Sequence, residues 1–364
     1  METLRLQRDW ADLPEELVTI IGEKITTNTA YIYLRFVCKA WRRALTPKPR
    51  HLPPQSPWLL LPGIRDGFEL DFYDPFQSKF HRFQCPYMRG KDICGSSHGW
   101  LVLEDDLRVS LFNPITQCSL DLPPFNAPPS ILISLPQGWR HYPYQNVMKA
   151  TVSCNPFEDG CVVVVQFRTM SKWELAFCRI GDTHWTGLLL QDMYGKGQML
   201  FDFTCHKNLV YTVNGNMVVS VHDLHNLSWR TFPSKISYNW RYDRVNIVKR
   251  DLESGEPLVV KTTDFCGTKM FCVYKWFDDS QRWFQVHNIG KQVLFLNWGH
   301  CISLLLGEGR GNQLYHSNFL PEAHYRVGIY QVDLKSGKDF MLNQSPELPY
   351  LIPGSPIWLL PSLI

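Results

Sequence analysis

The chain has 364 residues, and its 37 Lys and Arg against 34 Asp and Glu give a formal net charge of +3. This length accommodates a small adaptor segment and one large domain, and so small a net charge argues against a nucleic-acid partner. No run reaches the roughly eighteen apolar residues of a membrane span, and no secretory signal precedes the eleven cysteines. Since no secretory signal is visible and the cysteines form no C-x-x-C pair, we expect reduced thiols in a protein of the nucleus, the cytoplasm or both.

The first fifty residues predict a short helical segment. Asp12, with Glu15 three positions later, suits an N-terminal cap, and Pro14 is tolerated in a first turn that lacks intrahelical acceptors. Two apolar sets then recur at helical spacing on either side of turn residues 26–29: Leu17, Ile20, Ile21 and Ile25, and Leu34, Val37, Cys38, Trp41 and Leu45. Pro47 ends the second set.

The partner of these helices is left open by their pattern. Roughly forty helical residues rarely bury a core of their own, so some apolar side chains are expected to dock elsewhere. Helical spacing does not distinguish docking on the rest of the chain from docking on another protein. The excess of Lys and Arg over residues 35–50 suits either an acidic protein surface or an ordinary solvated face.

The segment resembles an F-box over about residues 8–48. The hallmark positions are Leu13-Pro14, Glu16-Leu17, Val37-Cys38-Lys39 and Trp41-Arg42. This resemblance implies an F-box at 8–50 that binds a Skp1-like protein and, through it, the cullin of an SCF ubiquitin ligase. Carried over by position, the expected Skp1 contacts are Leu13, Pro14, Leu17, Ile20, Leu34, Val37 and Trp41.

The composition of the chain changes after the predicted helices. Residues 51–57 form a Pro-rich connector, which we expect to be extended. Short runs rich in β-branched and aromatic residues follow, such as 99–103, 161–165 and 271–276, each bounded by Gly, Pro, Asn or Asp. These runs predict strands and make 58–364 a large all-β domain.

A loose repeat suggests how the strands are organised. A polar turn that leads to an aromatic residue recurs at 182–185, 225–229 and 279–283, with weaker copies at 75–80, 114–118 and 335–340. Six copies favour a β-propeller of about six blades, with five or seven also open, over a two-sheet sandwich. The two ends, 56–60 and 355–360, echo each other, so we predict that they share one blade and close the ring.

A second resemblance covers most of the chain. Its anchors are residues 95–101, 111–114, 122–124 and 356–363. With the F-box before them, they are similar to a large plant F-box family whose C-terminal region is a KIB-type, kelch-like β-propeller. The resemblance implies that the propeller binds the substrate protein.

Motifs for chemistry are weak throughout. Residues 95–99 fit G-x-S-x-G, but a strand follows where a nucleophile elbow needs a helix. His222 and His225 lack further ligands for a metal. We therefore expect no catalytic residue, cofactor or metal, and a propeller enzyme would instead need polar side chains converging on the central channel.

Two aromatic and Arg-rich segments have the composition of binding hot spots. They nominate Trp139, Arg140, Tyr142, Trp240, Arg241 and Tyr242 as substrate contacts, with packing between blades as the alternative. The sequence thus predicts a non-catalytic adaptor that presents an unidentified protein substrate for ubiquitination and degradation. A propeller scaffold or regulator with a degenerate F-box is the alternative.

Overall fold

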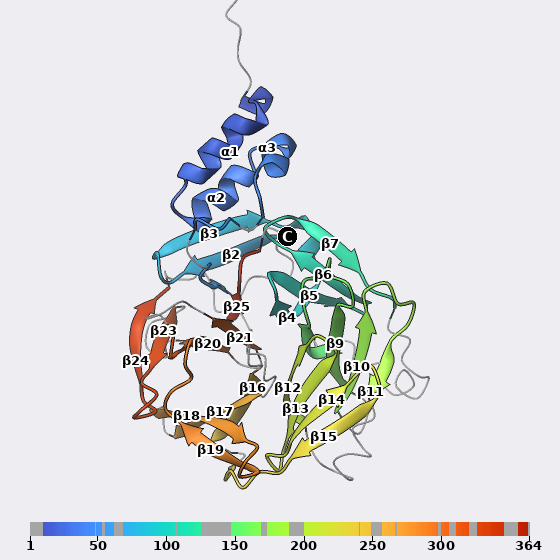
Figure 1. The fold of residues 1–364 in the computed structure, drawn as a ribbon, viewed down its shortest axis with the longest axis vertical. Helices are drawn as coiled ribbons and strands as arrows, with labels where there is room; N and C mark the ends of the chain where they lie inside the picture. The colour runs from blue at the N-terminus through green and yellow to red at the C-terminus, as the bar shows by residue number, and fades with distance from the viewer. Residues whose placement is uncertain are drawn as a thin grey trace, which may run out of the picture.

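Six β-sheets stand in a ring, and three short helices project from its rim (Figure 1). This computed structural model describes residues 10–47, 49–52, 55–61, 68–106, 108–124, 147–168, 173–188, 200–239, 241–248, 257–265, 268–297, 300–305, 311–319, 326–345 and 356–362. Within these residues, no helix is both long and apolar enough to cross a membrane.

The helices form a small head at the start of the chain. They are the 3-10 helix η1 (Trp10–Asp12) and the helices α1 (Glu15–Lys24), α2 (Asn28–Arg35) and α3 (Lys39–Ala44). The cap predicted at Asp12 is wrong, because Asp12 lies in η1 and the carbonyl of Pro14 accepts the N–H of Leu17 at 3.0 Å. The turn chemistry at 26–29 is confirmed, because the Thr27 side chain accepts the N–H of Ala30 and caps α2.

The head has a core of its own. The buried side chains are Val18, Tyr31, Trp41, Leu45 and, from the connector, Leu52. Helices α1 and α3 approach closely at Gly22, where a Cβ atom would lie 2.4 Å from Leu45 Cδ2. The second apolar set, from Leu34 to Leu45, therefore spans the end of α2 and all of α3, which fold back on α1.

Each sheet is one blade, and its strands are named in order from the axis of the ring outward. Blade one is β25 (Ile357–Leu359), β1 (Trp58–Leu60), β2 (Glu69–Asp74) and β3 (Lys79–Gln84), followed by the 3-10 helix η2 (Pro86–Met88); blade two is β4 (Asp92–Ser97), β5 (Trp100–Asp105), β6 (Arg108–Asn113) and β7 (Cys118–Asp121); blade three is β8 (Val147–Val152), β9 (Val162–Arg168), β10 (Trp173–Arg179) and β11 (Thr186–Leu188). Blade four is β12 (Leu200–His206), β13 (Leu209–Asn214), β14 (Val219–Asp223) and β15 (Ser228–Phe232); blade five is β16 (Asp243–Val248), β17 (Leu258–Phe265), β18 (Thr268–Phe277) and β19 (Arg282–Val286); blade six is β21 (His300–Leu305), β20 (Gln292–Asn297), β22 (Gln313–Phe319), β23 (Val327–Val332) and β24 (Asp339–Gln344).

The ring closes as the sequence predicted. Strand β25 from the end of the chain pairs antiparallel with β1, and Trp58 lies opposite Leu359 while Leu59 lies opposite Trp358. Both tryptophans are fully buried. Closure of this kind removes the open edge that a linear array of sheets would present.

The predicted repeat is also confirmed. Each of the six turns joins the last two strands of one blade. In every such turn one residue has a left-handed backbone: Ser78, Gln117, Gly181, Leu227, Gln281 and Gly337. Several of these turns contact the preceding blade. For example, Phe271 N of blade five donates to Gly337 O in the turn of blade six at 2.7 Å, so the turns also join neighbouring blades.

Blade six departs from the pattern. Its innermost strand, β21, follows β20 in the chain, and β20 then pairs in parallel with β22. The blade therefore has five strands, which the sequence repeat did not predict.

Candidate functional site

The predicted Skp1 contacts divide into two groups in the head. Pro14, Leu17, Ile20 and Val37 are exposed, the last three at 47%, 51% and 52%. Leu17 and Ile20 lie three residues apart on α1, and Val37 lies in the turn between α2 and α3. These exposed apolar side chains are available to a partner.

The other predicted contacts support the head itself. Leu13 and Leu34 pack against the core of the head, and Trp41 is buried within it, only 5% exposed. The indole Nε1 of Trp41 donates to the carbonyl of Trp10 at 2.9 Å, which ties α3 to η1. In this structure, Trp41 holds the helices in place.

Two exposed apolar residues of the head were missed by the sequence reasoning. Trp10 is 69% exposed, and Phe36 is exposed beside the guanidinium of Arg42, which lies 5.8 Å from its ring centroid. Trp10 lies just before the predicted start of the first helix. A large aromatic residue at that place could have been recognised from the sequence as a candidate partner contact.

The head is fixed to the outer side of blade one. Ile32 of α2 is buried in the same cluster as Trp58, so helix and propeller share a core. Tyr33 Oη lies 2.9 Å from His81 Nδ1, and the His81 ring stacks on Trp58 with centroids 4.2 Å apart. Burial lowers the pKa of His81 below its ordinary value. A neutral imidazole therefore sits at the junction at physiological pH.

A second contact joins the head to blade two. Arg42 Nη2 donates to the carbonyl of Thr116, in the turn between β6 and β7, at 3.3 Å. Contacts to two blades restrict both tilt and rotation of the head relative to the ring.

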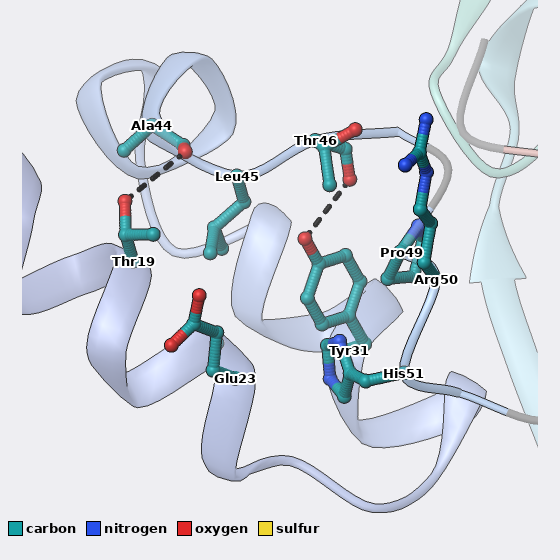
Figure 2. Close-up of a pocket in the computed structure, with 10 residues that line it drawn as sticks. Thr19, Glu23, Tyr31, Ala44, Leu45, Thr46, Pro49, Arg50 and His51 are labelled. Atoms are coloured by element: carbon teal, nitrogen blue, oxygen red, sulfur yellow. Dashed lines mark hydrogen bonds between the residues drawn. The ribbon is translucent and has the colours of Figure 1, made fainter.

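A hollow of about 620 Å³ lies where the connector folds against the head (Figure 2). Tyr31 points into it and donates through its hydroxyl to Thr46 O at 2.9 Å, while His51 packs edge-on against the Tyr31 ring. On the opposite side Thr19 donates to Ala44 O at 3.4 Å. These bonds hold the chain that leaves α3, so the hollow belongs to the attachment of the head.

Of the six nominated substrate contacts, Arg241 and Tyr242 lie within the described residues. Trp139, Arg140, Tyr142 and Trp240 lie outside them. Both Arg241 and Tyr242 are exposed, and the Tyr242 ring packs edge-on against Phe265, which is also exposed, at 5.2 Å. They lie in the connection from blade four to blade five. Since a blade of four antiparallel strands returns the chain to one side, such connections share one face of the ring.

The residues considered for catalysis in the sequence form hydrogen bonds within the propeller. Residues 95–99 belong to β4 and its turn into β5, and Ser97 Oγ donates to Val152 O at 2.7 Å. His222 is buried against Thr212 Oγ1, at 3.1 Å, and burial lowers its pKa to about 4. Among the described residues, no three His, Cys, Asp or Glu side chains are placed to hold a metal.

Polar side chains do converge around the axis of the ring. Lys149 of β8 forms an ion pair with Asp202 of β12 and donates to Phe203 O at 2.7 Å, while Ile247 N of β16 donates to Asp202 Oδ2 at 2.8 Å. On β21, burial and the Lys149 charge lower the pKa of His300 to about 3. The sequence reasoning missed this cluster. Both carboxylate oxygens are engaged in joining blades three, four and five, which favours a structural clasp over a catalytic role.

Comparison with known proteins identifies similar chains. The family model of the KIB1-4 β-propeller matches residues 72–331. The "Putative F-box protein At5g55150" of Arabidopsis thaliana is 23% identical over 316 residues, which are 82% of this chain and 81% of that one. The Arabidopsis F-box protein SKIP23 is 31% identical over 126 residues, 32% of this chain and 29% of that one.

Among solved structures, the chain is similar to TolB from Acinetobacter baumannii. The TM-score is 0.48 at 10% identity, over 91% of this chain and 73% of that one. The strand pairing itself defines a six-bladed β-propeller behind N-terminal helices. Because the propeller model covers most of the chain, this protein belongs to the KIB1-4 β-propeller family and is a distant relative of Arabidopsis F-box proteins.

Proposed function

We propose that this chain is the substrate-recognition subunit of an SCF-type ubiquitin ligase. Its head, within residues 8–50, binds a Skp1-like protein, and its propeller, within 58–364, binds the protein to be modified. The observation that carries the proposal is the group Leu17, Ile20 and Val37, each about half exposed on a head whose core is already filled. Family membership supports the same reading.

The expected gain from covering these residues is substantial. Complete burial of a Leu, Ile or Val side chain stabilises by about 1.5–3 kcal/mol, so covering the exposed half of each contributes roughly 1 kcal/mol. Burial of this surface would increase the affinity for a partner, whereas the same surface left exposed favours aggregation.

The junction of head and propeller supports the mechanism. The buried Ile32 and the contacts Tyr33–His81 and Arg42–Thr116 hold the two parts in one orientation. A ligase works here by proximity: a substrate on the propeller is kept near the charged conjugating enzyme, which raises the effective concentration of its lysine. The chain itself then makes no covalent bond.

Binding to purified Skp1 tests the proposal. We expect the full-length chain to bind in isothermal titration calorimetry and Leu17→Asp with Ile20→Asp to abolish binding, because both side chains would bury a carboxylate. Leu227→Asp, at an exposed leucine of blade four, is the matched control and should bind normally. Absence of binding by the wild-type chain, or normal binding by the double variant, would refute the adaptor role and favour a scaffold.

The substrate side of the proposal rests on the face that carries Arg241 and Tyr242. We propose that the six nominated residues contribute to this face. Once a substrate is known, Arg241→Ala with Tyr242→Ala should weaken its capture while Skp1 binding persists. Unchanged capture would assign these residues to packing instead.

A further inference from the structure

Two cysteines flank the loop that joins β8 to β9 in blade three. The register of this antiparallel pair places Val152 opposite Val163 where the two strands approach the loop. Continuing the same register by two residues on each strand places Cys154 opposite Cys161. The base of the loop therefore carries a cross-strand pair of thiols.

The spacing of the two backbones suits a disulfide. Ser153 N donates to Val162 O at 2.9 Å, so these residues form a hydrogen-bonded pair and the cysteines that follow form a non-hydrogen-bonded one. In agreement, the Cys161 N–H bonds to Glu158 O at 3.4 Å instead of crossing to Cys154. The Cα atoms of a non-hydrogen-bonded pair lie about 4.5 Å apart, within the span of about 4.4–6.8 Å that a disulfide bridges.

The two thiols also lie on the same side of the sheet. Cys161 is only 1% exposed, in the apolar cluster that blade three shares with blade two, and Cys154 packs against that cluster. Cys161 Sγ donates to Cys154 O at 3.4 Å. Burial raises the pKa of Cys161, and the adjacent Cys154 thiol raises it further, so the two thiols are close enough to interact.

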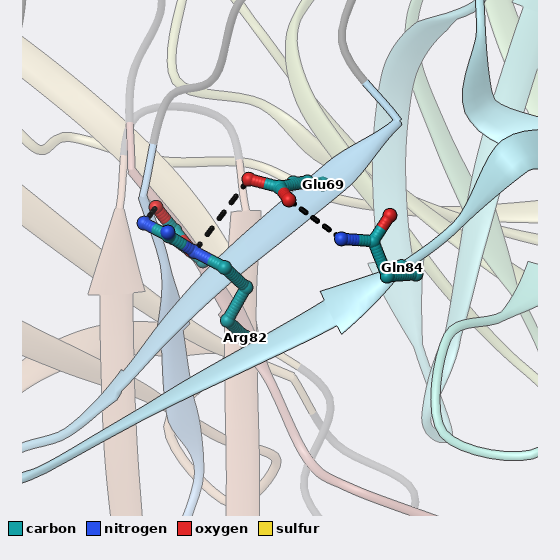
Figure 3. Close-up of polar contacts among 4 residues, drawn as sticks. Glu69, Arg82 and Gln84 are labelled. Atoms are coloured by element: carbon teal, nitrogen blue, oxygen red, sulfur yellow. Dashed lines mark hydrogen bonds and ion pairs between the residues drawn. The ribbon is translucent and has the colours of Figure 1, made fainter.

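Blade one shows that directly opposite side chains meet in the hairpins of this propeller (Figure 3). Asp71 lies opposite Arg82, and Arg82 Nε donates to Asp71 Oδ1 at 2.6 Å. Glu69 lies opposite Gln84, and Gln84 Nε2 donates to Glu69 Oε1 at 2.6 Å. In blade three the same relation joins two thiols, which can form a covalent bond.

The two thiols differ in their access to solvent. Cys154 is half-buried, whereas Cys161 is covered. A dissolved oxidant therefore reaches Cys154 first, and Cys161 is placed to react with the product. Other cysteines in paired strands have a different neighbour, as when Cys178 lies opposite Val163.

We propose that Cys154 and Cys161 are a site of reversible oxidation by peroxide, whose product is a disulfide within blade three. The Cys154 thiolate attacks hydrogen peroxide and becomes a sulfenic acid, while the peroxide, with the thiol proton, is reduced to one molecule of water. The Cys161 sulfur then attacks the Cys154 sulfur and forms the S–S bond. The hydroxyl group leaves with the Cys161 proton as a second water. A small thiol such as glutathione reverses the oxidation by exchange.

The disulfide fastens the loop that it closes. Residues 154–161 include Phe157, which is 62% exposed and packs edge-on against the buried Trp100 at 5.5 Å. Asn155 Oδ1 accepts the Phe157 N–H at 3.0 Å within the loop. A covalent bond at the base restrains opening of this loop, so oxidation limits the motion of Phe157.

Mass spectrometry of the full-length chain tests this inference. The reduced protein is treated with hydrogen peroxide near neutral pH, denatured, blocked with N-ethylmaleimide and digested with trypsin. Both cysteines lie in the tryptic peptide 150–168, which we expect to lose both alkylation sites and two hydrogens on oxidation. Cleavage after Glu158 then separates the cysteines, so only a disulfide keeps the fragments together, and dithiothreitol should release them.

Variants at each thiol separate the two steps. In Cys161→Ser the sulfenic acid has no resolving thiol, so dimedone should label Cys154, and the wild type should lose this label as its disulfide forms. In Cys154→Ser the buried Cys161 should remain a free thiol. Cys272→Ser, at a half-buried cysteine that lies opposite Lys261, is the matched control and should form the disulfide as the wild type does.

Three outcomes would overturn the proposal. They are a wild-type Cys154 that becomes a sulfinic acid beside a free Cys161, a Cys154 that links to another cysteine or another chain, and a pair that does not react. None of these outcomes depends on Skp1 binding, so the adaptor role stands or fails separately.

Hydrogen exchange measures the effect on the loop. Oxidation should slow amide exchange in residues 155–160 by at least about tenfold. The β2–β3 hairpin of Figure 3 has no cysteine between residues 69 and 84, so its exchange should not change. Unchanged exchange in the oxidised loop would refute the restraint on Phe157.

Discussion

The buried ion pair of Lys149 and Asp202 allows the effect of a substitution on the free energy of unfolding to be predicted. The Lys149 and Asp202 side chains are only 12% and 2% exposed, and they join the inner strands of blades three and four. Lys149→Met retains most of the aliphatic stem but removes the charge. Asp202 then keeps the Ile247 N–H as a donor and loses its cation.

The expected loss is large because the remaining charge stays buried. Removing one partner of a buried ion pair costs about 3–5 kcal/mol, whereas replacing both partners is often close to neutral. We therefore expect Lys149→Met to lower the free energy of unfolding at pH 7.5 by about 3–5 kcal/mol. Lys149→Met with Asp202→Asn should recover to within roughly 1 kcal/mol of the wild type.

The loss should also depend on pH. Burial raises the pKa of Asp202 and Lys149 lowers it, so removal of Lys149 raises that pKa further. A carboxyl whose pKa is higher folded than unfolded stabilises the fold most below its unfolded value, about 4, and this stability is lost as pH rises to the folded value. The deficit of Lys149→Met should therefore shrink from pH 7.5 to pH 5. In Lys149→Met the Lys149 charge no longer acts on His300, but burial, the larger cause, still lowers the pKa of that imidazole.

Urea denaturation of the wild type and both variants at pH 7.5 and 5.0 provides the measurement. A deficit below about 1 kcal/mol, or one that is equal at the two pH values, would refute the assignment of a buried, uncompensated carboxylate.

Three further predictions concern closure, turns and the head. Trp358→Ala should lower the free energy of unfolding by about 3–5 kcal/mol, because the buried indole also donates to Leu296 O at 3.0 Å; an unchanged urea midpoint would contradict its closing role. Leu227→Gly should raise the free energy of unfolding by roughly 0.5–1 kcal/mol, because the exposed Leu227 has a left-handed backbone with φ 54° and its removal loses no buried contact. A lower melting temperature of this variant would count against backbone strain at Leu227. Tyr33→Phe should lower the free energy of unfolding by about 0.5–1.5 kcal/mol, because it removes the hydrogen bond to His81. Amide hydrogen exchange should become faster in α2 but not in the blades. Equally faster exchange in α2 and in the blades would show that the bond does not act locally at the junction.

The fold was predictable where the chain repeats itself. The echo of 56–60 and 355–360 predicted the β1–β25 pair, and the six turns predicted the blades, because each turn imposes local chemistry. A further signal went unused. An Asp or Asn ends the third strand in several blades and accepts a backbone N–H two residues on, as Asp74 does from Phe76 at 2.9 Å and Asn113 does from Ile115 at 2.9 Å.

Other features depend on contacts that local pattern does not encode. Nothing in the alternation of 292–305 distinguishes β21 as the inner strand from β20, since both runs suit a strand. Lys149 and Asp202 lie 53 residues apart in sequence and meet only when blades three and four pack side by side. Trp41 matched its F-box position, but periodicity could not tell a side chain that packs inside the head from one that faces a partner.

The inner strands of the ring are joined to each other and leave recognition to its face. The Lys149–Asp202 ion pair joins the inner strands of blades three and four, and both carboxylate oxygens of Asp202 are engaged there. The head is attached to blade one through Ile32 and to blade two through Arg42, so two contacts fix its orientation relative to the ring. A protein bound on the face that carries Arg241 and Tyr242 would therefore be held at a fixed distance from the head, which is what the proposed action by proximity requires.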